Sequence, residues 1–103
     1  MKMPMHKVIE IYYKNNPKGH WFSEPTMRFF KSTLADYGYR KSNDIYFITG
    51  ERFNFDSKRY YTVRRLGDKV GGDINTVGEF NELTRDGARR LLAHTLGWKI
   101  KDL

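Results

Sequence analysis

Arginine is the residue type in this chain whose chemistry is easiest to interpret. Seven of the nine arginines follow residue 50. The guanidinium group is planar and presents a fork of N–H donors that matches phosphate and carboxylate groups. The later half of the chain therefore carries the candidates for binding an anionic partner.

One expected strand, residues 59–66, interleaves arginines with tyrosines. Because successive side chains of a strand point to opposite faces, two sets are expected: Arg59, Tyr61, Val63 and Arg65 on one face, and Tyr60, Thr62, Arg64 and Leu66 on the other. Basic groups beside aromatic rings suit a nucleic acid, since the cations meet phosphates and the rings stack on bases. The alternative is an ordinary exposed face of a basic protein whose tyrosines are covered by helices.

The last expected helix carries a second group of arginines. Arg85 and Arg89 are one turn apart, Arg90 is adjacent, and the helix N-terminus favours anions. The alternative is a solvated helix face opposite the apolar stripe.

On the strand at residues 59–66, the neighbours Arg64 and Arg65 cannot lie on the same face, so at most one of them belongs to a given binding surface. The candidate binding residues are Arg52, Arg59, Tyr61, Arg64, Arg65, Arg85, Arg89 and Arg90.

Residues for catalysis or metal binding do not form a recognisable pattern. The chain has no cysteine, and its three histidines lie far apart without the spacing of a triad or a metal site. Glu51 and Asp56 lie near arginines and are expected to form solvated ion pairs. Gly67 to Gly72 lacks the lysine–hydroxyl pair of a phosphate-binding loop and is expected to be a turn. We predict a binding protein, with no enzymatic activity, cofactor or metal.

Three helices and three strands are expected to position these residues. The helices run from about Met5 to Lys14, from Glu24 to about Leu34 after a Ser23 cap, and from Arg85 to Leu96 between Thr84 and Gly97. The strands cover residues 45–49, with an extension to 53, then 59–66 and 74–80, with a bulge at Gly78. Residues 36–44 are expected to be a loop. The prediction is an α+β fold: a three-stranded antiparallel meander with two N-terminal helices and one C-terminal helix over one face.

Composition and charge limit the classes of partner. The 103 residues fit one domain, and 19 Lys and Arg against 12 Asp and Glu give a net charge of +7. Such a charge favours encounters with polyanions and with acidic protein surfaces. Neither a bilayer-spanning apolar run nor a signal peptide is expected, so we predict a cytoplasmic protein without membrane contact.

Four stretches resemble, in order, a family of small uncharacterised phage-encoded proteins: HWFSEPTMRFF, YFITGERF, RYYTVRR and GDINTVGEF. The resemblance spans about Gly19 to Ala93 and implies a phage origin, with action in the cytoplasm of the infected host. Small phage accessory proteins often disarm host defences, so the prediction is an inhibitor of a host defence complex, with a CRISPR effector as the leading candidate. A +7 chain is a poor DNA mimic, so it would hold guide RNA, compete for nucleic acid or dock on an acidic patch.

A second resemblance supports the alternative of direct nucleic-acid binding. The order of helix, three strands and helix is similar to a double-stranded-RNA-binding domain, and residues 85–89 resemble the basic start of that family's last helix. On this interpretation the chain is an accessory domain that binds double-stranded RNA or DNA through its arginines. The sequence leaves the oligomeric state open.

Overall fold

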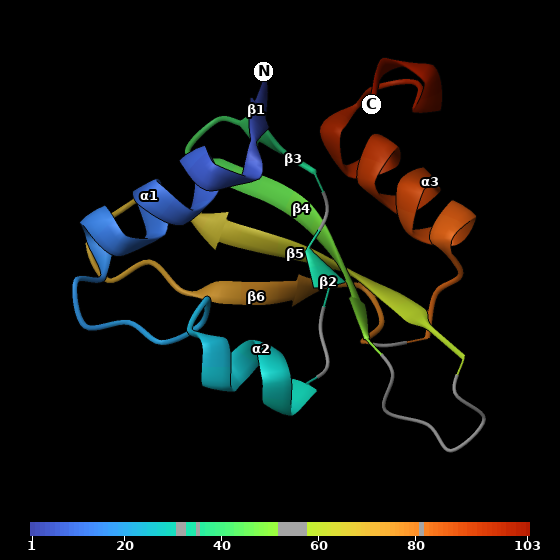
Figure 1. Ribbon diagram of the computed structural model, residues 1–103. Coiled ribbons are helices and arrows are strands. Elements are labelled where there is room, and N and C mark those ends of the chain that lie inside the picture. Colours follow the sequence, from blue (N-terminus) through green and yellow to red (C-terminus); the bar gives the residue numbers. More distant parts are fainter. Residues whose placement is uncertain (31–32, 35, 52–57, 81) are drawn as a thin grey trace.

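The computed structural model describes residues 1–30, 33–34, 36–51, 58–80 and 82–103. In these ranges an antiparallel sheet lies between two layers of helices (Figure 1). The helices are α1 (Met5–Asn15), α2 (Glu24–Phe30), α3 (Arg85–Leu96) and the 3-10 turn η1 (Ile100–Asp102). The strands are β1 (Lys2–Pro4), β2 (Thr33–Leu34), β3 (Tyr37–Lys41), β4 (Asp44–Glu51), β5 (Tyr60–Gly67) and β6 (Ile74–Val77).

The sheet is larger than the predicted three-stranded meander, which was wrong. Five antiparallel strands follow the order β1-β3-β4-β5-β6 within the described ranges, and the short β2 also pairs with β4. The expected meander forms its β4-β5-β6 part. The other edge of β4 pairs with two strands in succession. Its first part pairs with β3, where Tyr39 lies opposite Tyr46, and its later part pairs with β2, where Leu34 lies opposite Thr49.

The predicted loop at residues 36–44 is instead a hairpin. Its turn is Ser42-Asn43, and Ser42 takes a positive φ of 57°. Gly38 lies inside β3 because α1 packs directly on it: an added Cβ would overlap Val8 Cγ2 and lie 3.2 Å from Ile45 Cγ2. The second helix also ends earlier than predicted, at Phe30, and Thr33–Leu34 forms β2.

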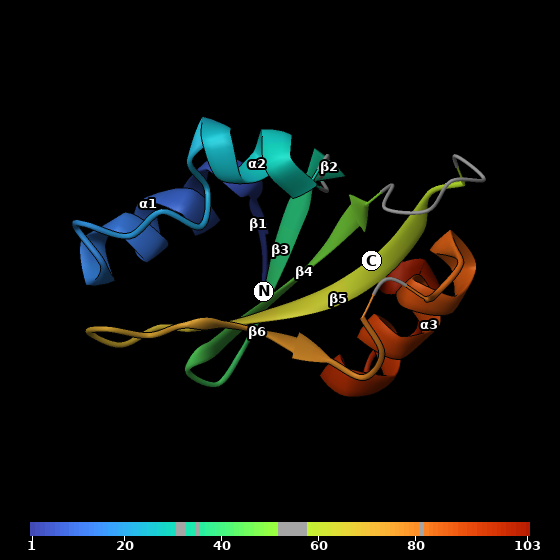
Figure 2. The ribbon, with the colours of Figure 1, turned by 90° about the horizontal axis from the view of Figure 1, so that it is seen from below.

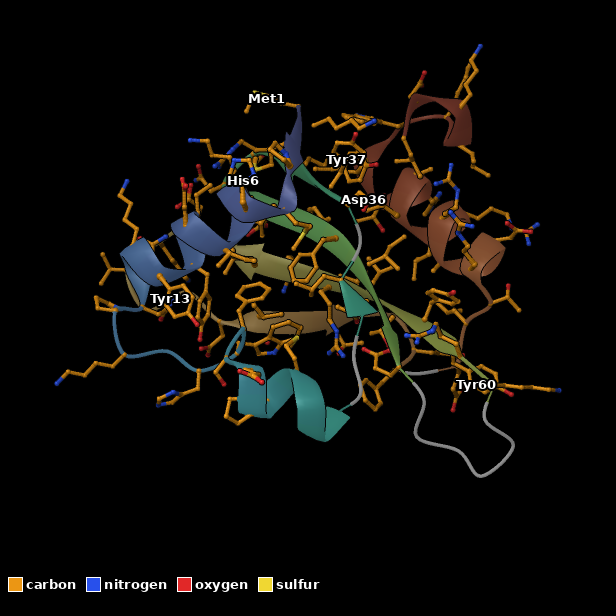
Figure 3. All side chains as sticks on the ribbon, in the orientation of Figure 1. Met1, His6, Tyr13, Asp36, Tyr37 and Tyr60 are labelled. Carbon is orange, nitrogen blue, oxygen red and sulfur yellow. The ribbon has the colours of Figure 1, made fainter. Side chains whose placement is uncertain are left out.

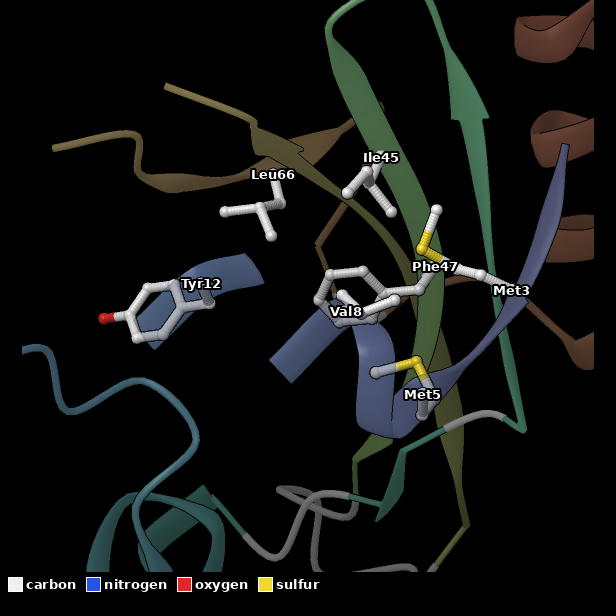
Figure 4. Close-up of a cluster of buried hydrophobic side chains, with 7 residues drawn as sticks. All are labelled: Met3, Met5, Val8, Tyr12, Ile45, Phe47 and Leu66. Carbon is white, nitrogen blue, oxygen red and sulfur yellow. The ribbon is translucent and has the colours of Figure 1, made fainter. Parts of the chain in front are cut away.

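Helices cover both faces of the sheet, so the prediction of helices over one face was wrong. Figure 2 shows α1 and α2 on one side and α3 on the other. The α1 side buries one cluster, drawn in Figure 4: Met3, Met5, Val8, Tyr12, Ile45, Phe47 and Leu66. The α3 side buries a second: Tyr39, Tyr46, Val63, Ala88, Leu92 and Leu96. Neighbouring residues of β4 enter opposite clusters, so two layers are needed to bury them.

The predicted caps of the last helix are confirmed. Thr84 caps α3 by accepting a hydrogen bond from the Gly87 amide at 3.0 Å, and Gly97 ends the helix with φ 73°. Trp98 folds back and packs edge-on against Tyr39, with ring centroids 5.6 Å apart. The predicted bulge at Gly78 is wrong, because β6 ends at Val77 and Gly78 follows it with φ 74°.

A polar network is buried on the α1 side of β4 and β5. Glu51 is completely buried and accepts hydrogen bonds from Arg64 Nη2 at 2.8 Å and from Thr62 Oγ1 at 3.2 Å. Arg64 also donates from Nε to Thr49 and from Nη1 to Thr76, both at 3.1 Å. Its guanidinium lies 5.4 Å from the Trp21 ring centroid and 5.2 Å from that of Phe80. Glu51 therefore forms a buried ion pair with Arg64, and the prediction of a solvated ion pair was wrong. Asp56 lies outside the described residues.

A second polar contact joins α1 to the sheet. Asp68, in the connection from β5 to β6, accepts hydrogen bonds from Asn15 at 2.9 Å and from Arg40 at 2.8 Å. These donors, Asn15 first and then Arg40, hold the pKa of the Asp68 carboxyl below its ordinary value of 3.8. The carboxylate thus connects the end of α1, β3 and the β5–β6 turn.

No helix in the described ranges is both long enough and apolar enough to span a bilayer.

Removing Arg64 should cost far more stability than removing its neighbour Arg65. Arg64→Met leaves the buried Glu51 carboxylate without its cation, and we expect the free energy of unfolding to fall by about 3 kcal/mol. Arg65 is exposed, so Arg65→Met should change it by less than about 0.5 kcal/mol. Urea unfolding measures both. Arg64→Met combined with Glu51→Gln should be more stable than Arg64→Met alone; equal values would show that the charge pair is not the cause.

Asp68→Asn should lower stability in a pH-dependent way. The Asp68 carboxyl has a lower pKa in the folded than in the unfolded protein. Its contribution to stability is therefore fully present above the unfolded pKa, near 3.8, and is lost as the pH falls through the folded pKa. We expect a loss of about 1 kcal/mol at pH 7 that shrinks below about pH 4. Asp73→Asn, an exposed change in the same connection, is the control. A pH-independent difference in urea midpoints would contradict this origin.

Candidate functional site

A pocket of about 480 Å³ lies between α3 and the α3-facing side of the sheet. Helix α3 lines it with Arg85, Arg89 and Leu92, and β4 with Ile48 and Gly50. Arg59, which directly precedes β5, and Tyr61, near the start of that strand, complete this part of the wall. The volume is in the range of sites that take small molecules or single groups of a larger ligand.

The opposite wall comes from β2, β3 and the segment between them. It consists of Leu34, Asp36, Tyr37 and Tyr39, with Leu103 near one end. Figure 3 labels Asp36 and Tyr37, which lie in the space between β3 and α3. The pocket therefore carries three guanidinium groups and one carboxylate on an aromatic and apolar lining.

Arg85 occupies a position that does not favour the helix itself. Arg85 is the first residue of α3 and Arg89 follows one turn later. The N-terminal end of a helix carries partial positive charge, so cations there are electrostatically unfavourable. Nothing in the capping of α3 requires an arginine at either position. A bound anion would offset this cost.

Within the part of the chain that the structure describes, Arg85 and Arg89 also lack internal partners. Among the residues that the structure describes, neither donates a side-chain hydrogen bond or forms an ion pair. Arg59 differs, because its Nη1 donates to the Gly50 carbonyl at 2.9 Å. Two guanidinium groups of the pocket are thus available to a ligand, and the third is held against the backbone.

Tyr39 contributes a fixed, protonated phenol. Its hydroxyl donates to the Leu103 carbonyl at 3.1 Å. Burial raises the pKa of Tyr39, and the charge of Arg89 only partly opposes this effect. At neutral pH the phenol therefore remains neutral and does not offset the positive charge of the arginines.

The structure brings together four of the eight predicted binding residues. Arg59, Tyr61, Arg85 and Arg89 all line the pocket. Arg65 and Arg90 are exposed outside the lining, and Arg64 belongs to the network on the other side of the sheet. The prediction for Arg52 lies outside the described residues. The predicted alternation along β5 is confirmed, since Tyr61 and Val63 face the α3 cluster while Leu66 faces the α1 cluster.

The lining residues with polar or aromatic side chains that were missed are Asp36, Tyr37 and Tyr39. They lie in the segment expected to be a loop, so nothing placed them on the sheet. Tyr37 and Tyr39 are two residues apart, which is the spacing of one strand face. That alternation was the available signal.

This arrangement can bind an anion that carries a flat or apolar group. Two guanidinium groups one helical turn apart can share a phosphate or carboxylate, and the tyrosines and aliphatic residues can contact the rest of the ligand. Within the described part of the chain, no group of three or more His, Cys, Asp or Glu side chains is placed to hold a metal ion.

Comparisons with known proteins add the family but no activity. Neither a curated protein nor a solved structure matches the chain. The phage origin, the role against CRISPR and the similarity to double-stranded-RNA-binding domains find no support in these comparisons. Residues 6–92 match a family of unknown function (DUF7447), and the chain therefore belongs to this family.

Proposed function

We propose that this protein binds nucleic acid and that the pocket between α3 and the sheet holds the phosphate groups. The observation that carries the proposal is the pair Arg85 and Arg89, one turn apart, lining an aromatic pocket without partners among the described side chains. Arginines without internal partners keep their full capacity to bind phosphate.

The charge of the whole chain supports the same class of partner. A net charge of +7 attracts a polyanion over long range and speeds its association. Arg65 and Arg90 are exposed outside the pocket, where they add to this attraction without a defined geometry. Long-range charge thus brings the polyanion to the surface, and the pocket provides the specific contact.

A phage origin and the inhibition of a host defence complex, such as a CRISPR effector, rest on the sequence resemblance and stay predictions. The pocket makes the predicted inhibition testable. An inhibitor acting through Arg85 and Arg89 would contact guide RNA, compete for the effector's nucleic acid or dock on an acidic patch of the effector, because these cations favour an anionic partner. The same arginine variants would then lose inhibition.

Neutralising the pocket arginines should weaken binding more than neutralising Arg90, their neighbour outside the pocket. We expect Arg85→Gln and Arg89→Gln each to lower affinity about tenfold, as the loss of one charge-assisted phosphate contact predicts. Each should also reduce the slope of log affinity against log salt by about one. Fluorescence anisotropy with labelled single-stranded and duplex DNA and RNA, at about 50 and 200 mM salt, measures both quantities.

Arg90→Gln is the matched control, because it removes the same charge from a position of the same helix outside the pocket lining. It should change affinity less than about twofold. Equal effects at positions 85, 89 and 90 would reduce the interaction to general charge attraction. Absence of binding to every nucleic acid would refute the proposed function.

A further inference from the structure

We propose that the pocket takes one unpaired nucleotide, with its phosphate at Arg85 and Arg89, its base against Tyr61, and an exocyclic amino group of the base toward Asp36. This inference rests on the proposed function and adds the form of nucleic acid and the kind of base.

The shape of the site favours an unpaired nucleotide. The arginines line a recess of about 480 Å³ and not a flat surface, and Tyr61 lies half-buried in it beside Ile48 and Leu92. In a duplex the bases are stacked inside and paired, so they cannot reach a ring that lies in a recess. A single strand can turn one base inward while its phosphate remains at the rim.

Tyr61 is held where it can receive that base. Its amide donates to the Leu83 carbonyl at 2.8 Å, which ties the start of β5 to the segment before α3. The arginines of α3 and the ring of β5 are thereby linked through the backbone within a few residues. Stacking on an aromatic ring is favourable for every base and is therefore not selective by itself.

Asp36 supplies the selectivity. Its backbone carbonyl accepts a hydrogen bond from the Met5 amide at 3.1 Å, which positions the residue at the pocket wall. Its carboxylate makes no hydrogen bond or ion pair with any described residue. A carboxylate repels phosphate and accepts hydrogen bonds from amino groups, which adenine, cytosine and guanine carry and thymine lacks. The ligand is thus oriented with its phosphate toward α3 and its base toward β3.

The test compares short single-stranded oligo-dC, oligo-dA and oligo-dT with a duplex, using anisotropy at one salt concentration. We expect the single strands with amino groups to bind at least about tenfold more tightly than the duplex and about fivefold more tightly than oligo-dT. Asp36→Asn should remove most of the difference between oligo-dC and oligo-dT, because an amide can both donate and accept.

Tyr61→Leu should abolish the preference for single strands, and Tyr61→Phe, which keeps the ring, should retain it. Tyr60→Leu is the control, since Tyr60, labelled in Figure 3, is the adjacent residue on the opposite face of β5. If Tyr61→Leu fails to fold, the comparison of duplex with single strands and the Tyr61→Phe variant still decide the question.

The outcomes separate this inference from the proposed function. Equal binding of duplex and single strands that still depends on Arg85 and Arg89 would overturn the unpaired nucleotide and leave nucleic-acid binding intact. Equal binding of the three single strands would overturn the role of Asp36. No binding of any strand would refute both.

Discussion

The arrangement of the molecule depends on one strand, β4, that is buried on both faces. Ile45 and Phe47 enter the cluster under α1, while Tyr46 and Ile48 face α3. A strand with apolar side chains in both directions needs a helical layer on each side. The N-terminal helices and α3 therefore lie on opposite sides of the sheet, and the boundary between α3 and the sheet is where the pocket forms.

Local signals predicted the elements that local interactions stabilise. The caps of α3 and the β-branched and aromatic runs of β4 and β5 could be located in the sequence because a few neighbouring residues determine them. β1, β2 and β3 could not be located in this way, since each is short and defined by pairing with distant residues. Gly38 is instructive: in the sequence it favours a loop, but in the structure it allows Val8 to pack onto β3.

The candidate site was predicted to the extent that it follows from periodicity. The two-residue period of the strand and the one-turn spacing on α3 predicted that Arg59 and Tyr61 share a face, as do Arg85 and Arg89. They did not predict that all four residues line one pocket. The role of Arg64 could not be predicted, because its partners Glu51 and Thr76 become neighbours only through the registers of three strands. Asp36 was missed for the same reason as β3.

The arginines of this chain carry the same charge but differ in the groups that surround them. Arg64 donates from each of its three guanidinium nitrogens to a protein side chain, Thr49, Thr76 or Glu51, so its guanidinium is held in place by internal partners. Arg85 and Arg89 have no such partners among the described residues, and Arg85 also stands at the helix N-terminus, where a cation is electrostatically unfavourable without an anion. Net charge alone would treat all of them as equivalent. Counting which guanidinium groups already have partners, and which of the others line the pocket, identifies Arg85 and Arg89 as the pair whose donors remain available for binding there.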